Sequence, residues 1–435
     1  MGRTKRKKVN VVTLGCSKNL VDSEQLMRQL QSNDFDIIHD SEDVSDIVII
    51  NTCGFIDNAK QESIDTILGF SDMKRNGMIE KLIVTGCLSE RFASELKEEI
   101  RDVDAWFGTS DLPNLLGHLN IGYKSELLGE RLLTTPSHFA YLKISEGCNR
   151  TCAFCAIPLM RGQLSSKPIE ILVGEAKKLA SGGTKEIILI AQELTYYGLD
   201  IYKKRMLATL LEKLSALEGI EWIRLHYAYP NQFPLDILPV IREHPNICHY
   251  LDIPFQHASD AVLNRMKRQA TRKEQESLIS LIRKEVPGIA LRTTMLVGFP
   301  GETEAEFQEL LDFIAEIRFD RLGVFMYSHE EGTSAYKLED DVPHAIKEER
   351  AARLMALQQE ISFEKNSALI GQALKVLIDR VEGDYFIGRS EFDSPEVDNE
   401  ILIPVQDTYL RVGDFCKAEI TDVSDFDLFA KVIKM

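Results

Sequence analysis

Strand-like and helix-like segments alternate along most of this 435-residue chain. Short apolar runs rich in Val and Ile are followed by longer segments whose apolar residues recur at helical spacing. This alternation is typical of parallel sheets whose strands are joined by helices. The sequence therefore predicts an α/β protein, and at about 150 residues per domain it has room for about three domains.

The first strand–helix units predict an N-terminal parallel α/β sheet domain over residues 8–123, followed by an interdomain linker at 124–136. Its strands are expected at 9–14, 47–50 and 81–85. The first helix is expected to begin at Asp22, since Gln25 three residues later completes a capping pattern. A cysteine follows each strand, in the order Cys16, Cys53 and Cys87. Because the carboxyl ends of parallel strands share one edge, where ligands bind, we expect these thiols to converge.

A second group of three cysteines lies in the segment SEGCNRTCAFCAIPLMR, at Cys148, Cys152 and Cys155. Bacterial ferredoxin motifs space their cysteines differently and supply a fourth thiolate, and structural zinc takes four ligands. Three thiolates ligate three irons of a [4Fe-4S] cluster and leave the fourth iron free to bind another molecule. Each cysteine group therefore predicts a [4Fe-4S] cluster with one open iron.

Six further strand–helix units follow within residues 137–369. Their strands are expected at 141–144, 186–190, 222–225, 249–253, 290–296 and 321–325. Their helices are expected at 169–180, 206–217, 235–243, 271–286 and 303–317. The last two helices begin with capping boxes, which pair Thr271 with Glu274 and Thr303 with Glu306. Six units predict a partial (β/α)6 TIM-like barrel, with functional residues at the carboxyl ends of its strands. A charged helical segment at 343–369 is expected to pack on this barrel.

The character of the sequence changes over residues 370–435. Short strand-like runs such as ALKVLIDRV, YFIGRSEF and FCKAEITDV predict a small antiparallel β-barrel. Residues 371–435 carry 7 Lys and Arg against 14 Asp and Glu, a formal balance of −7. Phosphate neutralisation dominates nucleic-acid affinity, so this acidic barrel is expected to contact a basic protein rather than RNA.

The motifs together resemble the radical S-adenosylmethionine (SAM) methylthiotransferases. LGCSKNLVDSE, INTCGFI and TGCLSER are similar to the N-terminal domain of that family, and the Cys-x3-Cys-x-aromatic-Cys run is similar to the radical SAM signature. YLDIPFQHASD and FDRLGVFMYSHEEGT extend the resemblance to the branch that methylthiolates an aspartate of ribosomal protein twelve of the small subunit. The resemblance implies a central radical SAM barrel and a C-terminal TRAM domain, and it covers nearly the whole chain.

The resemblance also implies the chemistry. Cys148, Cys152 and Cys155 would ligate the [4Fe-4S] cluster that cleaves SAM, and Cys16, Cys53 and Cys87 would ligate a second [4Fe-4S] cluster that holds sulfide. The product expected is a methylthio group on the β-carbon of an aspartyl residue, at the cost of two SAM molecules. Removing an unactivated hydrogen requires a radical that a cofactor supplies. A low-potential electron donor of the flavodoxin or ferredoxin type is therefore expected.

Four residues near strand ends are candidate SAM contacts. Phe154 is expected against the adenine or, alternatively, in loop packing. Gln192 and Glu193 follow the second barrel strand, where Glu193 could pair with the SAM ammonium, although exposed loop polarity explains Gln192 equally well. Gly298 ends the fifth barrel strand and permits close backbone approach, or it simply makes the turn around Pro300.

Composition and charge indicate the cellular compartment and the kind of partner. No apolar run reaches the ~18 residues that a membrane span requires, and the basic start MGRTKRKK leads into a strand-like run without a secretory cleavage site. Eight cysteines without an export signal indicate metal ligation in a reducing compartment, so a cytoplasmic protein is expected. Cys248 and Cys416, which lie inside strand patterns, are expected in the core. A net charge of −17 favours a basic partner.

Three alternatives remain open from the sequence. Methylthiolation of an isopentenylated adenosine in tRNA shares the same chemistry. A zinc or iron–sulfur module that binds RNA explains the cysteines and the terminal barrel, but it needs neither open irons nor six strand–helix units. An electron-transfer protein likewise needs no barrel that binds substrate.

Overall fold

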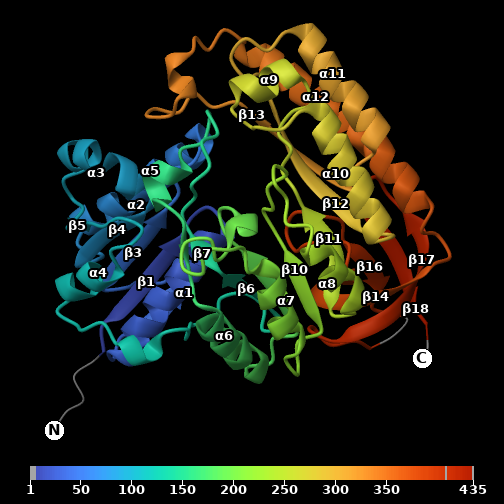
Figure 1. The fold of residues 1–435 in the computed structure, drawn as a ribbon. Coiled ribbons are helices and arrows are strands. Elements are labelled where there is room, and N and C mark those ends of the chain that lie inside the picture. Colours follow the sequence, from blue (N-terminus) through green and yellow to red (C-terminus); the bar gives the residue numbers. More distant parts are fainter. Residues whose placement is uncertain (1–5, 407–408, 434–435) are drawn as a thin grey trace.

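Three structural units follow one another along the chain in the computed structural model, which describes residues 6–406 and 409–433 (Figure 1). Most of the basic amino-terminal tail lies outside these described residues. The N-terminal α/β unit lies beside an open central barrel, and the C-terminal barrel closes one end of the central one (Figure 1). No helix among the described residues is long and apolar enough to cross a membrane.

The N-terminal unit is a five-stranded parallel sheet in the order β2-β1-β3-β4-β5. Its strands are β1 (Lys8–Thr13), β2 (Asp36–His39), β3 (Ile47–Thr52), β4 (Lys81–Gly86) and β5 (Ala105–Trp106). Its helices are α1 (Ser17–Ser32), α2 (Asp57–Arg75), α3 (Cys87–Glu99) and α4 (Leu112–His118). The two edge strands were not predicted, because both are short and neither has a fully buried residue.

The expected start of the first helix is wrong. Helix α1 begins at Ser17 with Cys16 as its N-cap residue, so Asp22 lies inside the helix. The Asp22 carboxylate accepts hydrogen bonds from Lys143 and Arg161 of the central unit instead of capping its own helix. Ion pairs with the central unit therefore explain why position 22 is acidic, although the local sequence pattern suggested a helix cap.

The central unit is a six-stranded, all-parallel sheet in the order β13-β12-β11-β10-β9-β6, open between its two edges. Its strands are β6 (Phe139–Lys143), β9 (Glu186–Ile190), β10 (Trp222–Leu225), β11 (Ile247–Asp252), β12 (Ala290–Val297) and β13 (Arg321–Met326). The predicted parallel fold is confirmed. The prediction succeeded because strands that are buried on both faces require continuous apolar runs, which are visible in the sequence.

Helices cover the outer face of this sheet and form the largest core of the molecule. They are α6 (Ile169–Ser181), α7 (Leu207–Ser215), α8 (Ile237–Glu243), α10 (Arg272–Glu285), α11 (Glu304–Ile317) and α12 (His344–Ser367). Helix α9 (Asp260–Arg265) packs instead in a separate apolar cluster at the end of β12. As expected for the charged segment, α12 packs on the barrel through Leu354 and Ile361. The inner face instead contacts α1, whose Val21 packs with Tyr141 and Ile190.

Both predicted capping boxes are present, and they permit a stability test. The Thr303 hydroxyl accepts the Glu306 amide at 3.2 Å, and the Glu306 carboxylate accepts the Thr303 amide at 2.7 Å. Thr303→Ala is expected to cost about 1 kcal/mol of unfolding free energy, because the Glu306 amide at the start of α11 loses its hydroxyl partner. Denaturant unfolding measures this cost, and Thr303→Ser, which keeps the hydroxyl, should restore most of it.

The C-terminal unit is a closed five-stranded barrel in the order β14-β15-β16-β18-β17. Its strands are β14 (Ala373–Glu382), β15 (Tyr385–Arg389), β16 (Ile401–Pro404), β17 (Phe415–Val423) and β18 (Leu428–Val432). The small barrel was predicted correctly, and its pairs are antiparallel except β16 with β18. Cys416 lies in its core, as expected, and Cys248 is buried under it.

The segment 390–399, which connects β15 to β16, fills the amino end of the central barrel. Inner-face residues of the sheet bind it: Arg224 donates to the Glu391 carbonyl at 2.7 Å and Arg321 to Asp393 at 2.8 Å. Tyr250 donates to Asp398 at 2.7 Å. The amino end is therefore sealed, and only the carboxyl ends of the strands remain available for chemistry.

This seal should contribute strongly to stability. Asp393 and Arg321 are 1% and 9% exposed, so Asp393→Ala would leave a buried guanidinium without its partner. We expect a loss of about 3 kcal/mol and a clearly lower melting temperature. Glu221→Ala, which removes an exposed pair with Lys375 at the same interface, should change stability by no more than about 1 kcal/mol. Calorimetry of the two variants side by side checks this contrast, and equal losses would contradict it.

Candidate active site

The first cysteine group lies at the carboxyl edge of the N-terminal sheet. Cys16 is the N-cap residue of α1, Cys53 follows β3 and Cys87 is the first residue of α3. Gly15 has a left-handed φ of 89°, and a Cβ at that position would lie only 2.7 Å from the Cys53 Cβ. The glycine therefore allows the loop that carries Cys16 to approach Cys53 closely.

Two thiols of this group, Cys53 and Cys87, are buried, whereas Cys16 is exposed. Burial, with a smaller contribution from the nearby Cys16 and Cys53 thiols, raises the pKa of Cys87 to about 12. Burial also raises the pKa of Cys53, again with a contribution from Cys16. Metal coordination deprotonates such thiols outright, so the donor set fits an iron–sulfur cluster better than a reactive free thiol.

The second cysteine group lies on the loop between the short strand β7 (Ser145–Glu146), which follows β6, and α5 (Ile157–Arg161), above the carboxyl end of the central sheet. Burial raises the pKa of Cys148 to about 11 and that of Cys155 to about 12, and the neighbouring cysteines add to both shifts. The same argument for metal ligation applies. Across residues 6–406 and 409–433, no three His, Cys, Asp or Glu side chains form a site for a single metal ion.

A cationic donor contacts one thiol in each group. Arg161 Nε donates to Cys87 Sγ at 3.3 Å, and Arg268 Nη1 donates to Cys152 Sγ at 3.5 Å. The Tyr229 hydroxyl also lies 3.6 Å from Cys152 Sγ. Hydrogen bonds to cluster sulfurs tune reduction potential, so these groups stand where they would act on a bound cluster.

Arg161 joins the two cysteine groups. Helix α5 begins just after Cys155, ends at Arg161 and packs on α3, where Ala156 and Met160 contact Cys87. A single helical turn therefore links the loop of one group to a thiol of the other. Of the site residues found only in the structure, Arg161 had a signal in the sequence, since it closes the quoted cysteine motif.

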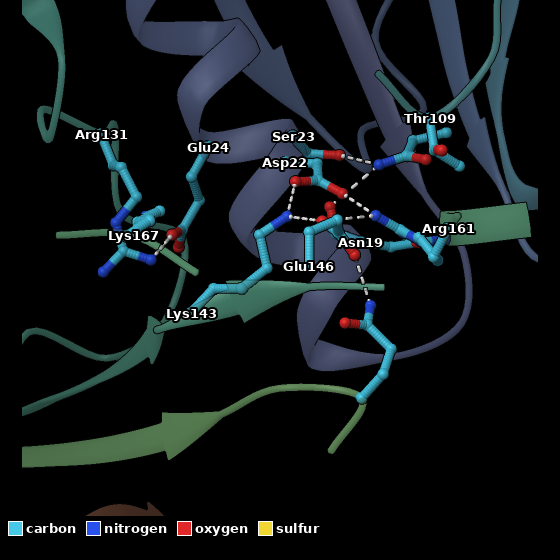
Figure 2. Close-up of polar contacts among 12 residues, drawn as sticks. Asn19, Asp22, Ser23, Glu24, Thr109, Arg131, Lys143, Glu146, Arg161 and Lys167 are labelled. Atoms are coloured by element: carbon cyan, nitrogen blue, oxygen red, sulfur yellow. Dashed lines mark hydrogen bonds and ion pairs between the residues drawn. The ribbon is translucent and has the colours of Figure 1, made fainter. Parts of the chain in front are cut away.

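Charged residues around Arg161 form a buried network between α1 and the barrel (Figure 2). Arg161 donates to Asp22 at 2.6 Å and to Glu146 at 3.3 Å, and Lys143 donates to the same two carboxylates. Arg161 also donates to the Asn19 side chain. Burial alone would raise the pKa of Asp22, but the Lys143 and Arg161 charges outweigh it and lower the pKa. The network thus holds two cations and two carboxylates in fixed positions.

The predicted SAM contacts fall into two environments. Gln192 donates to Glu146, which also accepts from Arg161, so it belongs to the same charged network. Glu193 is buried; it accepts from Arg150 at 3.0 Å and from the Thr195 amide at 2.7 Å. Its carboxylate therefore already has partners, and a role toward the SAM ammonium stays a prediction.

Phe154 and Gly298 lie together at the other side of the cysteine loop. Phe154 packs against an apolar cluster that includes Leu296 and Phe299, at the end of β12. Gly298 has a left-handed φ of 74°, and its amide donates to Glu302 at 2.9 Å. Both are placed at a strand end, which is compatible with adenine contact and with local packing alike.

His257 and Glu302 are buried beside this turn, where the Glu302 carboxylate also accepts a hydrogen bond from Arg350 at 2.8 Å. His257 Nε2 lies 3.6 Å from the Glu302 carboxylate. Burial raises the pKa of Glu302 to about 7 and lowers the pKa of His257 to about 3. The histidine is therefore neutral and packed in the core at physiological pH, in agreement with a structural role rather than metal ligation.

Three stretches of the chain match known families. Residues 8–108 match the uncharacterized protein family UPF0004, residues 142–314 match the radical SAM superfamily and residues 370–433 match the TRAM domain. The solved structure of the radical SAM methyltransferase TsrM from Kitasatospora setae, with cobalamin and a [4Fe-4S] cluster, has a TM-score of 0.53 at 14% identity. That match covers 74% of this chain and 75% of TsrM. The cobalamin-dependent enzyme OxsB gives 0.52 at 15% identity, over 83% of this chain and 56% of OxsB. Fold and sequence together define a radical SAM enzyme with an additional α/β domain and a TRAM domain.

Relatives of known name are much closer in sequence. The ribosomal protein uS12 methylthiotransferase RimO of Cytophaga hutchinsonii is 58% identical over 428 residues, 98% of each chain. The RimO of Christiangramia forsetii is 57% identical, over 99% of this chain and 95% of the relative. The chain therefore belongs to the RimO family of radical SAM methylthiotransferases.

Proposed function

We propose that this enzyme transfers a methylthio group to the β-carbon of an aspartyl residue of ribosomal protein uS12. Similarity to the RimO proteins over nearly the whole chain supports the substrate. The observation that carries the chemistry is the α5 link, which runs from Cys155 to an arginine on Cys87. Sulfur transfer to a substrate radical requires the sulfur source and the radical source to be neighbours, and this link between the two cysteine groups supports that arrangement.

We assign one [4Fe-4S] cluster to Cys148, Cys152 and Cys155 and a second to Cys16, Cys53 and Cys87. When bound, the clusters and SAM supply hydrogen abstraction, the sulfur and its methyl group. The protein itself contributes position and exclusion of water. Helix α1 covers the inner face of the barrel with Val21, and the segment 390–399 seals the opposite end. A substrate residue is thereby admitted only at the carboxyl ends of the strands.

The cofactors need an external electron source, which we propose is a low-potential flavodoxin- or ferredoxin-type donor. The acidic TRAM barrel supports a basic ribosomal protein, rather than nucleic acid, as the direct substrate. Methylthiolation of an isopentenylated tRNA adenosine, the alternative left open by the sequence, has no such support from the charge of this domain.

Mass spectrometry of uS12 tests the proposal. Reconstituted enzyme, SAM, sulfide and a reductant should add to uS12 the mass of one methylthio group replacing one hydrogen, and fragment ions should place it on an aspartate. A uS12 variant with asparagine at that position is the control, and it should stay unmodified. Modification of bulk tRNA under the same conditions, with uS12 unchanged, would refute the proposal.

A further inference from the structure

Lys18 is a buried cation on the side of α1 that faces the central sheet. It lies two residues after Cys16, and only 8% of its surface is exposed. Its ammonium lies 3.1 Å from the centre of the Tyr227 ring. Across residues 6–406 and 409–433, this ammonium has neither a hydrogen-bond acceptor nor a carboxylate partner. Because a buried charge is costly without an opposite charge beside it, a cation in this position indicates an anion that arrives with a ligand.

The charged network one helical turn further along α1 does not supply that anion. Lys143 and Arg161 both donate to Asp22 (Figure 2). The same two cations donate to Glu146, so two positive and two negative charges balance there. Lys18 precedes Asp22 by four residues, yet the structure gives no contact between its ammonium and either carboxylate among the described residues. The charge of Lys18 is therefore available to a ligand, whereas the charges of the network are already paired.

The aromatic ring beside Lys18 is held by an unusual backbone conformation. Tyr227 follows β10 and has a left-handed φ of 62°, which is rare for a bulky residue. Its amide donates to Asp252 at 3.2 Å, and its carbonyl accepts from the Leu194 amide at 3.2 Å. Strained backbone of this kind persists only where the surroundings enforce it, and it clusters at ligand sites.

Tyr227 also offers a second donor. Its side chain is half-buried, and its hydroxyl has no hydrogen-bond partner in the part of the chain that the structure describes. The phenol belongs to the same ring on which the Lys18 ammonium lies. An ammonium and a hydroxyl, both without acceptors, are thus presented side by side.

The contact between Lys18 and Tyr227 joins the surroundings of the two cysteine groups. Lys18 is two residues from Cys16 of the first group. Tyr227 is two residues before Tyr229, whose hydroxyl lies 3.6 Å from Cys152 Sγ of the second group. A substrate carbon that loses hydrogen to one cofactor and receives sulfur from the other has to lie in this region.

We infer that Lys18, together with the Tyr227 hydroxyl, binds the side-chain carboxylate of the substrate aspartyl residue. This role rests on the proposed function, which makes an aspartyl residue the substrate. A carboxylate has two oxygens that accept hydrogen bonds, and a bond from an ammonium is among the strong, charge-assisted ones. In an aspartyl side chain the carboxylate is bonded directly to the β-carbon. Holding the carboxylate therefore fixes the reacting carbon one bond away.

The same contact gives specificity for an acidic residue. An asparagine side chain fits the same space but brings no negative charge, so the Lys18 ammonium would stay buried without an anion. A neutral nucleobase has the same deficiency. Sites built to bind a polar group reject analogues that lack it, because their own buried groups are then left unpaired. Lys18 is accordingly a substrate-binding residue that selects aspartate.

A double-mutant cycle between enzyme and substrate tests this inference. The oxidised holoenzyme with SAM but without reductant does not turn over, so its affinity for uS12 can be measured by calorimetry. Replacing the modified aspartate of uS12 by asparagine should weaken binding to the unmodified enzyme about thirtyfold or more, because Lys18 loses its anion. In Lys18→Met, which keeps the apolar stem of the side chain, the same asparagine substitution should change the affinity by no more than about twofold.

Lys375→Met is the matched control. The Lys375 ammonium also packs on an aromatic ring, 4.1 Å from the centre of Phe415, but it lies on β14 and pairs with the exposed Glu221. This variant should distinguish aspartate from asparagine as well as the unmodified enzyme does. Lys18→Arg, which keeps the charge in a different shape, should recover part of the discrimination. Iron content and cluster absorbance, measured for every variant, show that the holoenzyme is intact.

Three outcomes would overturn the inference. One is equal discrimination by Lys18→Met and the unmodified enzyme. Another is a loss of affinity in Lys18→Met that is the same for both forms of uS12, since the contact would then be with the polypeptide and not with the carboxylate. The third is a shifted reduction potential of the cluster assigned to Cys16, Cys53 and Cys87 with discrimination retained, which would assign Lys18 to that cluster. Failure of the proposed function looks different, because the unmodified enzyme would then leave uS12 without a methylthio group.

Discussion

Replacing Cys148 by alanine should abolish reductive cleavage of SAM, whereas replacing Cys87 should preserve it and abolish only methylthiolation of uS12. In the proposed assignment each cysteine group would provide three thiolates for its own cluster, so loss of one thiolate would remove that cluster alone. Each variant should therefore lose half of the iron. The measurements are iron content, 5′-deoxyadenosine formation under strictly anaerobic conditions and the mass of uS12.

Cys416→Ala is the matched control for these two variants. This cysteine lies in the core of the C-terminal barrel, away from both groups, so iron content and both activities should be unchanged. SAM cleavage that survives in Cys148→Ala would contradict the assignment. Loss of SAM cleavage in Cys87→Ala, with the cluster of Cys148, Cys152 and Cys155 still visible by absorbance, would contradict it equally.

Arg161→Met should lower methylthiolation by about ten- to a hundredfold, the usual effect of removing a group that supports a metal ligand. The guanidinium donates to Cys87 Sγ and ties this thiol to Asp22 and Glu146. A cluster that loses a cationic donor to its sulfur is harder to reduce, so its reduction potential should fall. Potentiometry followed by electron paramagnetic resonance measures this in a background where Cys148, Cys152 and Cys155 are replaced by alanine.

The conservative variant Arg161→Lys distinguishes a role in positioning the Cys87 thiol from a purely structural role. Arg161→Lys keeps the charge but loses the planar fork that reaches a sulfur and two carboxylates at once, so it should recover part of the potential and part of the activity. Arg242→Met is the control, because this arginine pairs with the exposed carboxylates of Glu243 and Glu285 at the far end of the barrel. An unchanged potential in Arg161→Met would mean that the residue only holds the units together.

The sequence was most informative where burial and periodicity coincide. The strands at 186–190 and 222–225 agree with their predicted bounds, and both capping boxes are present. The edge strands β2 and β5 gave no such signal, because half-buried two- to four-residue strands resemble loops. The pattern of three cysteines after three strands predicted their shared sheet edge, which the fold confirms, while their ligation of iron stays a prediction.

What the sequence did not reveal depends on contacts between distant parts of the chain. Asp22 looked like a helix cap, yet its carboxylate binds Lys143 and Arg161, more than a hundred positions away. Nothing in the local sequence indicated that Arg268 would reach Cys152. Long-range ion pairs leave no periodic trace, so the supporting residues of the site became visible only in the fold.

The connection between β15 and β16 has a mechanical consequence. Residues 390–399 are bound by inward-facing arginines of the central sheet. The TRAM barrel therefore cannot rotate without pulling this segment out of the central barrel. The distance between the TRAM barrel and the carboxyl ends of the central strands is therefore fixed. A ribosomal protein that contacted the TRAM barrel while its aspartate lay at the carboxyl ends of the central strands would have to extend along the full length of those strands. At about 3.3 Å per residue that is roughly 20 Å of extended chain, which only a protruding loop can bridge.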